Sequence, residues 1–498
     1  MAQVGSITAS GIAIAMRSGK PRLDTRKAFA LGVRSLDLAS TLTIRLSVVM
    51  SLGLGGCVLA PEGTREEQAK LDANSPLFEP PIETRRLPEL PAQVDWRAVL
   101  HRAFLANGEL ESAYFEWKTA LTRIVQASTW PNSNVAVSLS YMFSPEKMKF
   151  WDRATVGVGF DPSVTLSLPI KVETAGEVAL EAARQAAERF RAVKFDLQRR
   201  VLSAYLDLAL TEEKIRIERD NLTLLKLLTD SAADRAQAGG PLQDLLKAQI
   251  ESQIEENELA NLEAEANSMR GMLNGMLARD ANAPLKLPPA LPLPRAVAAD
   301  DARLIAVAVD ENPELAGLAR QVAGRIDAIE LARLAYLPDL VPSASITGSI
   351  SQVVGAMIML PTKMPAIRAA IDEAEAMTRS AKATLRQTGK DRAASFVANL
   401  YIMRNAERQT ELYRRRVVPA AQQLVSSSQN AYAAGAVGFA DLIDSERMLI
   451  SVRRMVVQAQ IEREKRLAEL EAFAGVDIET LGRPKSVSAT QPGSLPVQ

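Results

Sequence analysis

Apolar residues alternate with serine, threonine and glycine in three short stretches, which predicts β-strands with one apolar face and one wet face. The apolar positions of the first two stretches are Val135, Val137, Leu139, Tyr141, Phe143, Val156, Val158, Phe160, Val164, Leu166 and Leu168. Those of the third are Ala344, Ile346 and Ile350. Small uncharged residues on the wet face suit a half-buried soluble sheet, and they also suit a wall that faces a water-filled lumen.

A fourth stretch, from Gln352 to Leu360, follows the third but loses the alternation. We expect a strand here as well, because the stretch lies where the partner of the third strand must lie. The hairpin that it closes is expected to be short.

Each strand pair is followed by a very long run with helical composition. No proline interrupts residues 170–240, and after Pro365 the next proline is Pro419. A helix from roughly residue 172 to 237 would be about 100 Å long at about 1.5 Å per residue. Return helices are expected to begin near Asp244 and Asp441 and to end near Gly275 and Gly475. Pro419 lies inside the second outgoing helix and should bend it locally.

Glycine turns join each outgoing helix to its return helix. The first turn contains Gly239 and Gly240, and the second contains Gly435 and Gly438. Gly435 and Gly438 can take positive φ at little cost, which suits a helix end and its turn. Asp441 then falls in the first turn of the next helix, where the helix dipole favours a carboxylate.

The two turns belong to two halves that repeat the same order of elements. The matched pairs are Asn107 with Asn312, Trp130-Pro131 with Leu337-Pro338, Leu168-Pro169 with Leu360-Pro361, Tyr205 with Tyr401, and Gly239 with Gly435. The offset of roughly 190 to 207 residues is too long for a solenoid unit and predicts a duplicated domain.

The N-terminal part reads as a secretory signal. Arg45 precedes a short apolar run that ends in Leu54-Gly55-Gly56-Cys57, and the run is too short to span a bilayer. This ending resembles a bacterial lipoprotein processing site, at which Cys57 would become the acylated first residue; the alternative is a buried core cysteine. Val58 after it favours outer-membrane sorting by the same resemblance. Residues 1–44 are unusual for such a signal, which leaves the true translation start open.

These patterns divide the chain into six parts. The expected parts are a signal-peptide region (1–56), a lipidated extended segment (57–93), a first repeat (94–283), a proline-rich linker (284–300), a second repeat (301–475) and a disordered tail (476–498).

Composition narrows the chemistry that the chain can perform. Lys+Arg and Asp+Glu both total 59, so there is no net field to attract nucleic acid. One histidine, His101, and one cysteine leave almost nothing for metal ligation or thiol chemistry. We therefore expect no cofactor and no metal. Paired carboxylates alone could serve a hydrolase, but no αβ pattern that would form a pocket surrounds them.

Three consecutive motifs closely resemble the TolC family of outer-membrane efflux ducts. They are Leu412-Tyr-Arg-Arg-Arg-Val-Val-Pro419, Ala431-Tyr432-Ala-Ala-Gly435 and Asp441-Leu-Ile-Asp444. The resemblance extends over roughly residues 94 to 475. It implies a mainly α fold with a membrane β-barrel: three chains each give four strands to a twelve-stranded barrel, and their long helices continue as a periplasmic α-helical barrel. Open edges are not tolerated in lipid, so four strands per chain independently require several chains.

The resemblance also implies a function and partners. The expected protein is a passive exit duct of a tripartite efflux system in the outer membrane, lipid-anchored and homotrimeric. An inner-membrane pump supplies the energy, and a periplasmic adaptor docks at the turns that contain Gly239, Gly240, Gly435 and Gly438. Two rivals stay open: the same duct in a type I protein secretion system, and a lipid-anchored coiled-coil scaffold without a channel.

Asp441 and Asp444 are the candidate functional side chains. Their spacing of three places them on one helix face. In the family the matching pair rings the closed periplasmic entrance, where crowded carboxylates attract cations. The alternative is a solvated helix N-terminus with a capping acid, which accounts well for Asp441 alone. In the first hairpin Asp244 matches only the first position, and Lys247 stands at the second.

Overall fold

The computed structural model describes residues 58–130, 135–143, 147–160, 167–297, 299–347 and 351–481. The expected signal peptide, its processing site at Cys57, the strand positions Val164, Leu166 and Ile350, and the tail beyond residue 481 lie outside the described residues. Among the helices of the described part, none is both long enough and apolar enough to cross a membrane.

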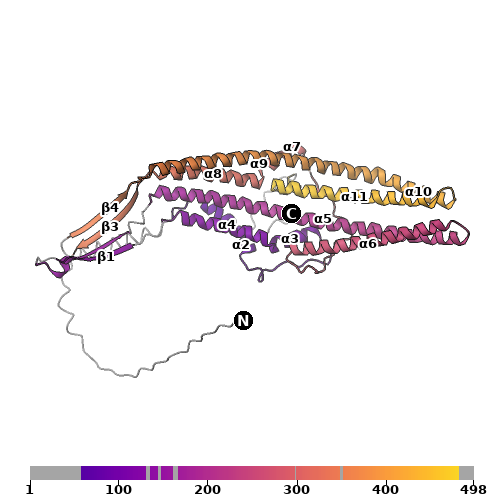
Figure 1. Ribbon diagram of the computed structural model, residues 1–498, viewed down its shortest axis with the longest axis horizontal. Helices are drawn as coiled ribbons and strands as arrows, with labels where there is room; N and C mark the ends of the chain where they lie inside the picture. Colours follow the sequence, from indigo (N-terminus) through magenta and orange to yellow (C-terminus); the bar gives the residue numbers. More distant parts are fainter. Residues whose placement is uncertain are drawn as a thin grey trace, which may run out of the picture. The chain divides into compact units, whose positions relative to one another are not determined.

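Two long helical hairpins contact each other along their length (Figure 1). The first consists of α5 (Pro169–Gln237) and α6 (Leu242–Met276). In the second, α9 (Met364–Leu412) and α10 (Val418–Ala433) run outward and α11 (Phe439–Ala474) returns. Proline in the first turn of α5 and α9 fits the helix start, where its missing N–H costs no bond. The predicted long helices and their ends are confirmed.

The outgoing limb of the second hairpin changes its winding just before Pro419. Residues Tyr413–Val417 (η2) form a π-helical turn between α9 and α10. Proline has no N–H to donate to the carbonyl four residues earlier, and wide turns of this kind are a common cause of helix bending. The bend expected at Pro419 therefore corresponds to this wide turn.

A pair of shorter helices opens each repeat. The pairs are α3 (Trp96–Ala106) with α4 (Gly108–Ala127), and α7 (Asp301–Asp310) with α8 (Pro313–Leu334). The side chain of Asn107 accepts a hydrogen bond from the Glu109 amide, and that of Asn312 accepts one from the Leu315 amide at 2.8 Å. Both asparagines therefore cap a helix, as their matched positions predict.

Two segments that we predicted to be irregular are ordered instead. Within residues 58–93, α2 (Thr64–Phe78) is helical, and its Phe78 stacks on Tyr114 with ring centres 5.0 Å apart. Within the expected tail, η3 (Ile478–Thr480) forms a short 3-10 turn, and Ile478 is buried in the core. The predictions of an extended conformation over 58–93 and of disorder over 476–481 are therefore wrong, whereas the predicted lipidation of Cys57 lies outside the described residues. Burial of a few apolar side chains against distant helices outweighs the local proline and glycine signals.

The four strands form one antiparallel sheet in the order β1-β2-β3-β4. They are β1 (Val135–Tyr141), β2 (Ala154–Phe160), β3 (Asp339–Thr347) and β4 (Ser351–Met359). The expectation of a short second hairpin is wrong, because β3 and β4 have nine residues each and β1 and β2 have seven. Ladder bonds come from the backbone, so they pair β4 in full although its side chains do not alternate.

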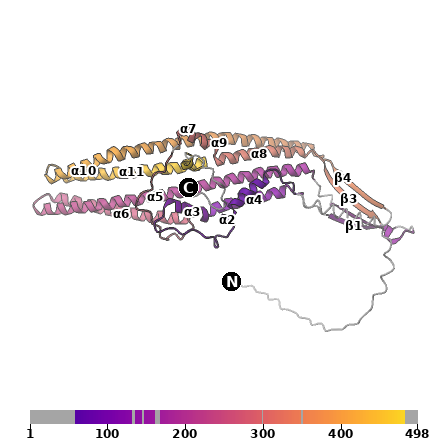
Figure 2. The same ribbon diagram turned by 180° about the vertical axis from the view of Figure 1, so that it is seen from behind.

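The sheet lies at one end of the long helices and the hairpin turns lie at the other (Figures 1 and 2). Between them α2 to α6 enclose the larger hydrophobic core, with Tyr114, Phe190 and Tyr205 at its centre. A second core joins α7, α9 and α11 around Phe396 and Leu470. Contacts of α5 with α8 and α11 join the two repeats, and the chain from Val58 onward forms one compact unit.

Candidate functional site

Both helical hairpins turn through a glycine in the left-handed conformation. The φ angle is 93° at Gly239 and 72° at Gly435. A Cβ added at either glycine would meet no described atom within 4 Å, so both turns face open space. The positive φ predicted at Gly435 is confirmed, but that at Gly438 is wrong: its φ is −76°, because it is the extended residue that starts α11. Gly240 donates its amide to the Arg235 carbonyl at 2.8 Å and closes α5.

The two turns are held together by side chains from both hairpins. A small apolar cluster contains Leu225, Ala248, Tyr432, Phe439, Leu442 and Ile443. The Arg235 guanidinium lies 4.2 Å from the centre of the Tyr432 ring and donates to the Tyr432 carbonyl at 3.0 Å. It also donates to the Ala433 carbonyl at 3.3 Å. A cation of the first hairpin thus binds the carbonyl end of α10, where the helix dipole favours positive charge.

Asp441 and Asp444 both lie on the exposed face of α11, as their spacing predicts. Asp441 Oδ2 accepts a hydrogen bond from the Gly438 amide at 3.2 Å, so this carboxylate caps its own helix. The Asp444 side chain is 74% exposed and lies 3.8 Å from the Arg447 guanidinium one turn on. In a single chain Asp441 therefore has a local role already, and Asp444 is the freer of the two carboxylates.

Next to the turns, an ion network connects the two hairpins. Arg447 of α11 binds Glu251 of α6 through two hydrogen bonds, at 2.7 and 2.5 Å. Arg454, two turns further along α11, pairs with the fully buried Glu218 of α5. The contact with Glu251 raises the pKa of Arg447. Both arginines of α11 thus pair with carboxylates of the first hairpin.

Glu255 on α6 extends this network, and its pKa is raised. Burial, and then a hydrogen bond to Glu218 and the charge of that residue, raise the pKa of Glu255 to about 8. Two carboxyl groups that face each other cannot both ionise cheaply, so one keeps its proton near neutral pH. Near neutral pH, the buried site at Glu218 therefore contains a protonated Glu255 together with the positive charge of Arg454.

At the other end of the helices, the sheet has one face of apolar side chains and one face of small polar side chains. The register places Leu139 opposite Val156, and the Thr155 hydroxyl lies 3.0 Å from that of Thr347. Leu139 is 76% exposed and Val156 is 44% exposed, so the apolar face is bare in the single chain. The predicted alternation is confirmed for these strands. On β4, exposed Val353 and Met357 fall on the wet-face side of the register, which explains why the alternation is lost there.

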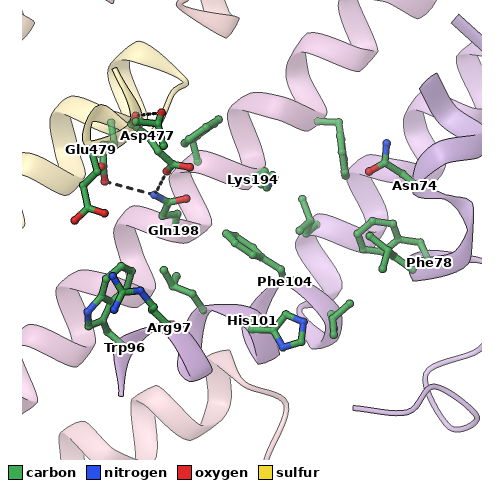
Figure 3. Close-up of a pocket in the computed structure, with 18 of the residues that line it drawn as sticks. Asn74, Phe78, Trp96, Arg97, His101, Phe104, Lys194, Gln198, Asp477 and Glu479 are labelled. Atoms are coloured by element: carbon green, nitrogen blue, oxygen red, sulfur yellow. Dashed lines mark hydrogen bonds between the residues drawn. The ribbon is translucent and has the colours of Figure 1, made fainter. Parts of the chain in front are cut away.

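A cavity of about 160 Å³ lies between α2, α3, α5 and the segment around η3 (Figure 3). Its lining combines Phe78 and Phe104 with polar side chains that already have contacts within the chain. Gln198 donates to Asp477 at 3.0 Å, and the Lys194 ammonium lies 5.5 Å from the centre of the Phe104 ring. The cavity therefore looks structural. In the described part of the chain, no group of three or more His, Cys, Asp or Glu could hold a metal ion.

The sequence analysis missed the ion network between the hairpins. Glu251 and Glu255 are four apart, and Arg447 and Arg454 are seven apart, so each pair does share a helix face. That spacing was the available signal. It could not show that the two faces meet, because this depends on the register between α6 and α11.

Comparison with solved structures places this arrangement among known folds. Three similar chains are MtrE from Neisseria gonorrhoeae, described as an outer membrane channel, VceC from Vibrio cholerae, described as an outer membrane protein, and a membrane protein from Pseudomonas aeruginosa. MtrE is 17% identical, with 78% of this chain and 91% of MtrE covered and a TM-score of 0.64. VceC is 16% identical, with 77% and 96% covered and a TM-score of 0.64. The third is 18% identical, with 82% and 100% covered and a TM-score of 0.63.

No protein-family model matches the chain, and no curated protein matches it either. The fold is nevertheless that of TolC-like outer-membrane channels, because the match to these structures extends over most of both chains. The resemblance drawn from the turn and strand motifs is thus confirmed at the level of fold.

Proposed function

We propose that the chain is the outer-membrane exit duct of a tripartite efflux system, which carries small molecules from a periplasmic pump to the exterior. The observation that carries this proposal is the four-stranded sheet with a bare apolar face at the end of long helices. A face that exposes Leu139, Val156 and Ile358 is costly in water and favourable in lipid. Nine strand residues at about 3.4 Å each reach about 30 Å, enough for the apolar band of a barrel after tilting.

The duct would be a homotrimer. β1 and β4 are the edges of the sheet, and each has a partner on one side only among the described strands. Three copies that pair β4 of one chain with β1 of the next would close a twelve-stranded barrel without edges. The long helices would then continue the lumen into the periplasm, since α5 alone has 69 residues and reaches about 100 Å.

Transport through this duct would be passive and would need no cofactor. An inner-membrane pump would supply the energy, and an adaptor protein would dock at the turns around Gly239 and Gly435. Two features support the docking site: both turns face open space, and each is fixed by a glycine with positive φ.

Cys57 would be the acylated mature N-terminus, which anchors the chain to the outer membrane. One acyl chain anchors only marginally, whereas a barrel holds far more firmly. The variant Cys57→Ala should therefore lose fatty-acid label but stay in the membrane fraction after alkaline washing. A coiled-coil scaffold held by acyl chains alone would be released by the same change. Release of the variant would thus contradict the duct, and equal label in both proteins would contradict acylation.

Asp441 and Asp444 would form the cation-binding ring of the closed entrance. Three chains would bring six carboxylates to one axis, and such a ring retains divalent ions. Asp444→Asn removes half of this charge without touching the cap that Asp441 makes to Gly438. We expect weaker block of the single-channel current by divalent cations from the periplasmic side. Asp244→Ala is the matched control, because it removes a first-turn acid of the other hairpin. Equal block in wild type and Asp444→Asn would mean that these acids are only solvated helix ends.

A further inference from the structure

The connection between β1 and β2 carries an exposed aromatic cluster. The Tyr141 ring lies 5.0 Å from Phe143 and 5.4 Å from Phe150, and Phe150 lies 5.6 Å from Trp151, all between ring centres. Phe143 is 90% exposed and Trp151 is 74% exposed. Aromatic rings gathered at a surface in this way usually mark a contact with a partner or a membrane.

This cluster continues the apolar face of the sheet. Leu139 and Tyr141 are two apart on β1, so they lie on the same face, and Leu139 is opposite exposed Val156. The cluster begins where the strand ends, on the side of the sheet away from the long helices (Figures 1 and 2). Aromatic residues at the end of an apolar band are typical of the interface between hydrocarbon and head groups.

Two exposed lysines are close to the aromatic residues in the sequence. Lys149 immediately precedes Phe150 and Lys147 lies three residues before it, and both lysines are exposed. Over residues 141–153 the sequence has three cations, the third being Arg153, against the acids Glu146 and Asp152. The second hairpin differs, because residues 348–350 between β3 and β4 are Gly-Ser-Ile, with no aromatic or basic residue. Rings together with ammonium groups fit an amphipathic ligand that carries phosphate.

We propose that this connection binds phosphorylated glycolipid head groups of the outer leaflet, the lipid A phosphates, through Lys147 and Lys149, with Phe150 and Trp151 in the interface. The inference rests on the proposed function, since it requires the sheet to lie in the outer membrane. The outer leaflet is chosen because the connection lies at the end of the sheet opposite the helices, which extend into the periplasm under that proposal. Phosphatidylglycerol of the inner leaflet has the same phosphate chemistry and is the alternative that the test must separate.

The test is native mass spectrometry of the purified full-length protein in detergent with three lipids. These are bis-phosphorylated lipid A, dephosphorylated lipid A and phosphatidylglycerol. We expect the wild type to prefer bis-phosphorylated lipid A over the other two. Lys147→Ala/Lys149→Ala should lose this preference, by about fivefold per lysine. Trp151→Ala should weaken the binding of both forms of lipid A equally, because an indole ring does not distinguish a phosphorylated head group from a dephosphorylated one.

The control is Lys382→Ala/Lys390→Ala, which removes two exposed lysines of α9 and should change nothing. The inference is overturned if the wild type binds both forms of lipid A equally or prefers phosphatidylglycerol. It is also overturned if the control variant loses as much of the preference for bis-phosphorylated lipid A as Lys147→Ala/Lys149→Ala does. Single-channel recordings on the same preparations separate this result from the proposed function. Conductance without a phosphate preference would contradict only the proposed lipid site and not the duct. A phosphate preference without conductance would support the lipid site and contradict the duct.

Discussion

Arg295 is the residue whose replacement should most clearly reveal how the segment between the repeats is held to α11. It lies between the repeats and pairs with two carboxylates of α11, Glu464 at 3.0 Å and Glu471 at 2.7 Å. The three side chains are 9%, 7% and 1% exposed. Breaking a buried pair leaves an uncompensated charge, which costs about 3 to 5 kcal/mol. In Arg295→Met, Glu464 keeps its contact with Arg463, so only Glu471 loses its cationic partner. We therefore expect the lower end of this range, a loss of about 3 kcal/mol in the free energy of unfolding.

The assay is thermal unfolding followed by circular dichroism in detergent. A change of 1 kcal/mol shifts Tm by about 2 to 4 °C in a chain of 150–250 residues, and the shift falls with size, so about 3 to 6 °C is expected here. Replacing a buried pair by apolar residues is often close to neutral. Arg295→Met/Glu471→Leu should therefore recover most of the loss, although Glu471→Leu alone removes one of the two carboxylates that pair with the buried arginine. A double variant as unstable as the sum of the single variants would refute this reasoning.

The pH dependence gives a second readout for the same variant. Burial raises the pKa of Glu471 above its ordinary value of 4.5, and Arg295 opposes that rise. Without Arg295 the folded protein holds a proton that the unfolded chain releases above pH 4.5, so stability increases as pH falls towards that value. The Tm deficit of Arg295→Met relative to wild type should be smaller at pH 5 than at pH 8. A deficit that grows at pH 5, or that stays below about 1 °C throughout, would contradict an ion pair of this strength.

Two further predictions concern the contacts between the hairpins. Burial and Glu218 raise the pKa of Glu255 to about 8, so this group stabilises the folded state most at low pH and loses that effect as pH rises from 4.5 to about 8. Glu255→Gln should flatten this part of the Tm-versus-pH curve, and an equally steep curve would argue against a raised pKa of Glu255. Arg235→Leu removes the donors to the Tyr432 and Ala433 carbonyls. Amide exchange at the second turn should accelerate about fivefold to tenfold, as for a lost hydrogen bond of about 1 kcal/mol, and unchanged exchange would show that the hairpins are not held there.

Much of the fold follows from local sequence signals. The ends of α5 are set by Pro169 and by Gly239, and the run between them has no proline to interrupt it. The strands of the first hairpin follow from the alternation that separates Leu139 from Ser138 and Ser140. Local signals failed at α2, because its buried Phe78 packs on Tyr114 of α4, a contact that the local sequence does not show. They failed again at β4, where pairing with β3 fixes the strand regardless of its side chains.

The candidate site could be predicted only in part. Gly435 and Asp441 were recognisable because a helix end and a helix start impose local requirements on φ and on charge. Arg447 and Glu251 were not, because their contact depends on how α11 packs against α6. The spacing within each segment shows only that like charges share a helix face, so structure is needed to find which faces meet.

The central claim, that three copies of this chain form a water-filled duct across the outer membrane, is tested most directly by single-channel recording in planar lipid bilayers. Purified full-length protein in trimeric form should insert and give discrete current steps, with divalent cations blocking from the side of the helical turns. The same preparation should show a folded helical spectrum and remain in the bilayer after alkaline washing. Folded, membrane-inserted protein that never produces current steps, even when Asp441 and Asp444 are neutralised, would contradict the duct.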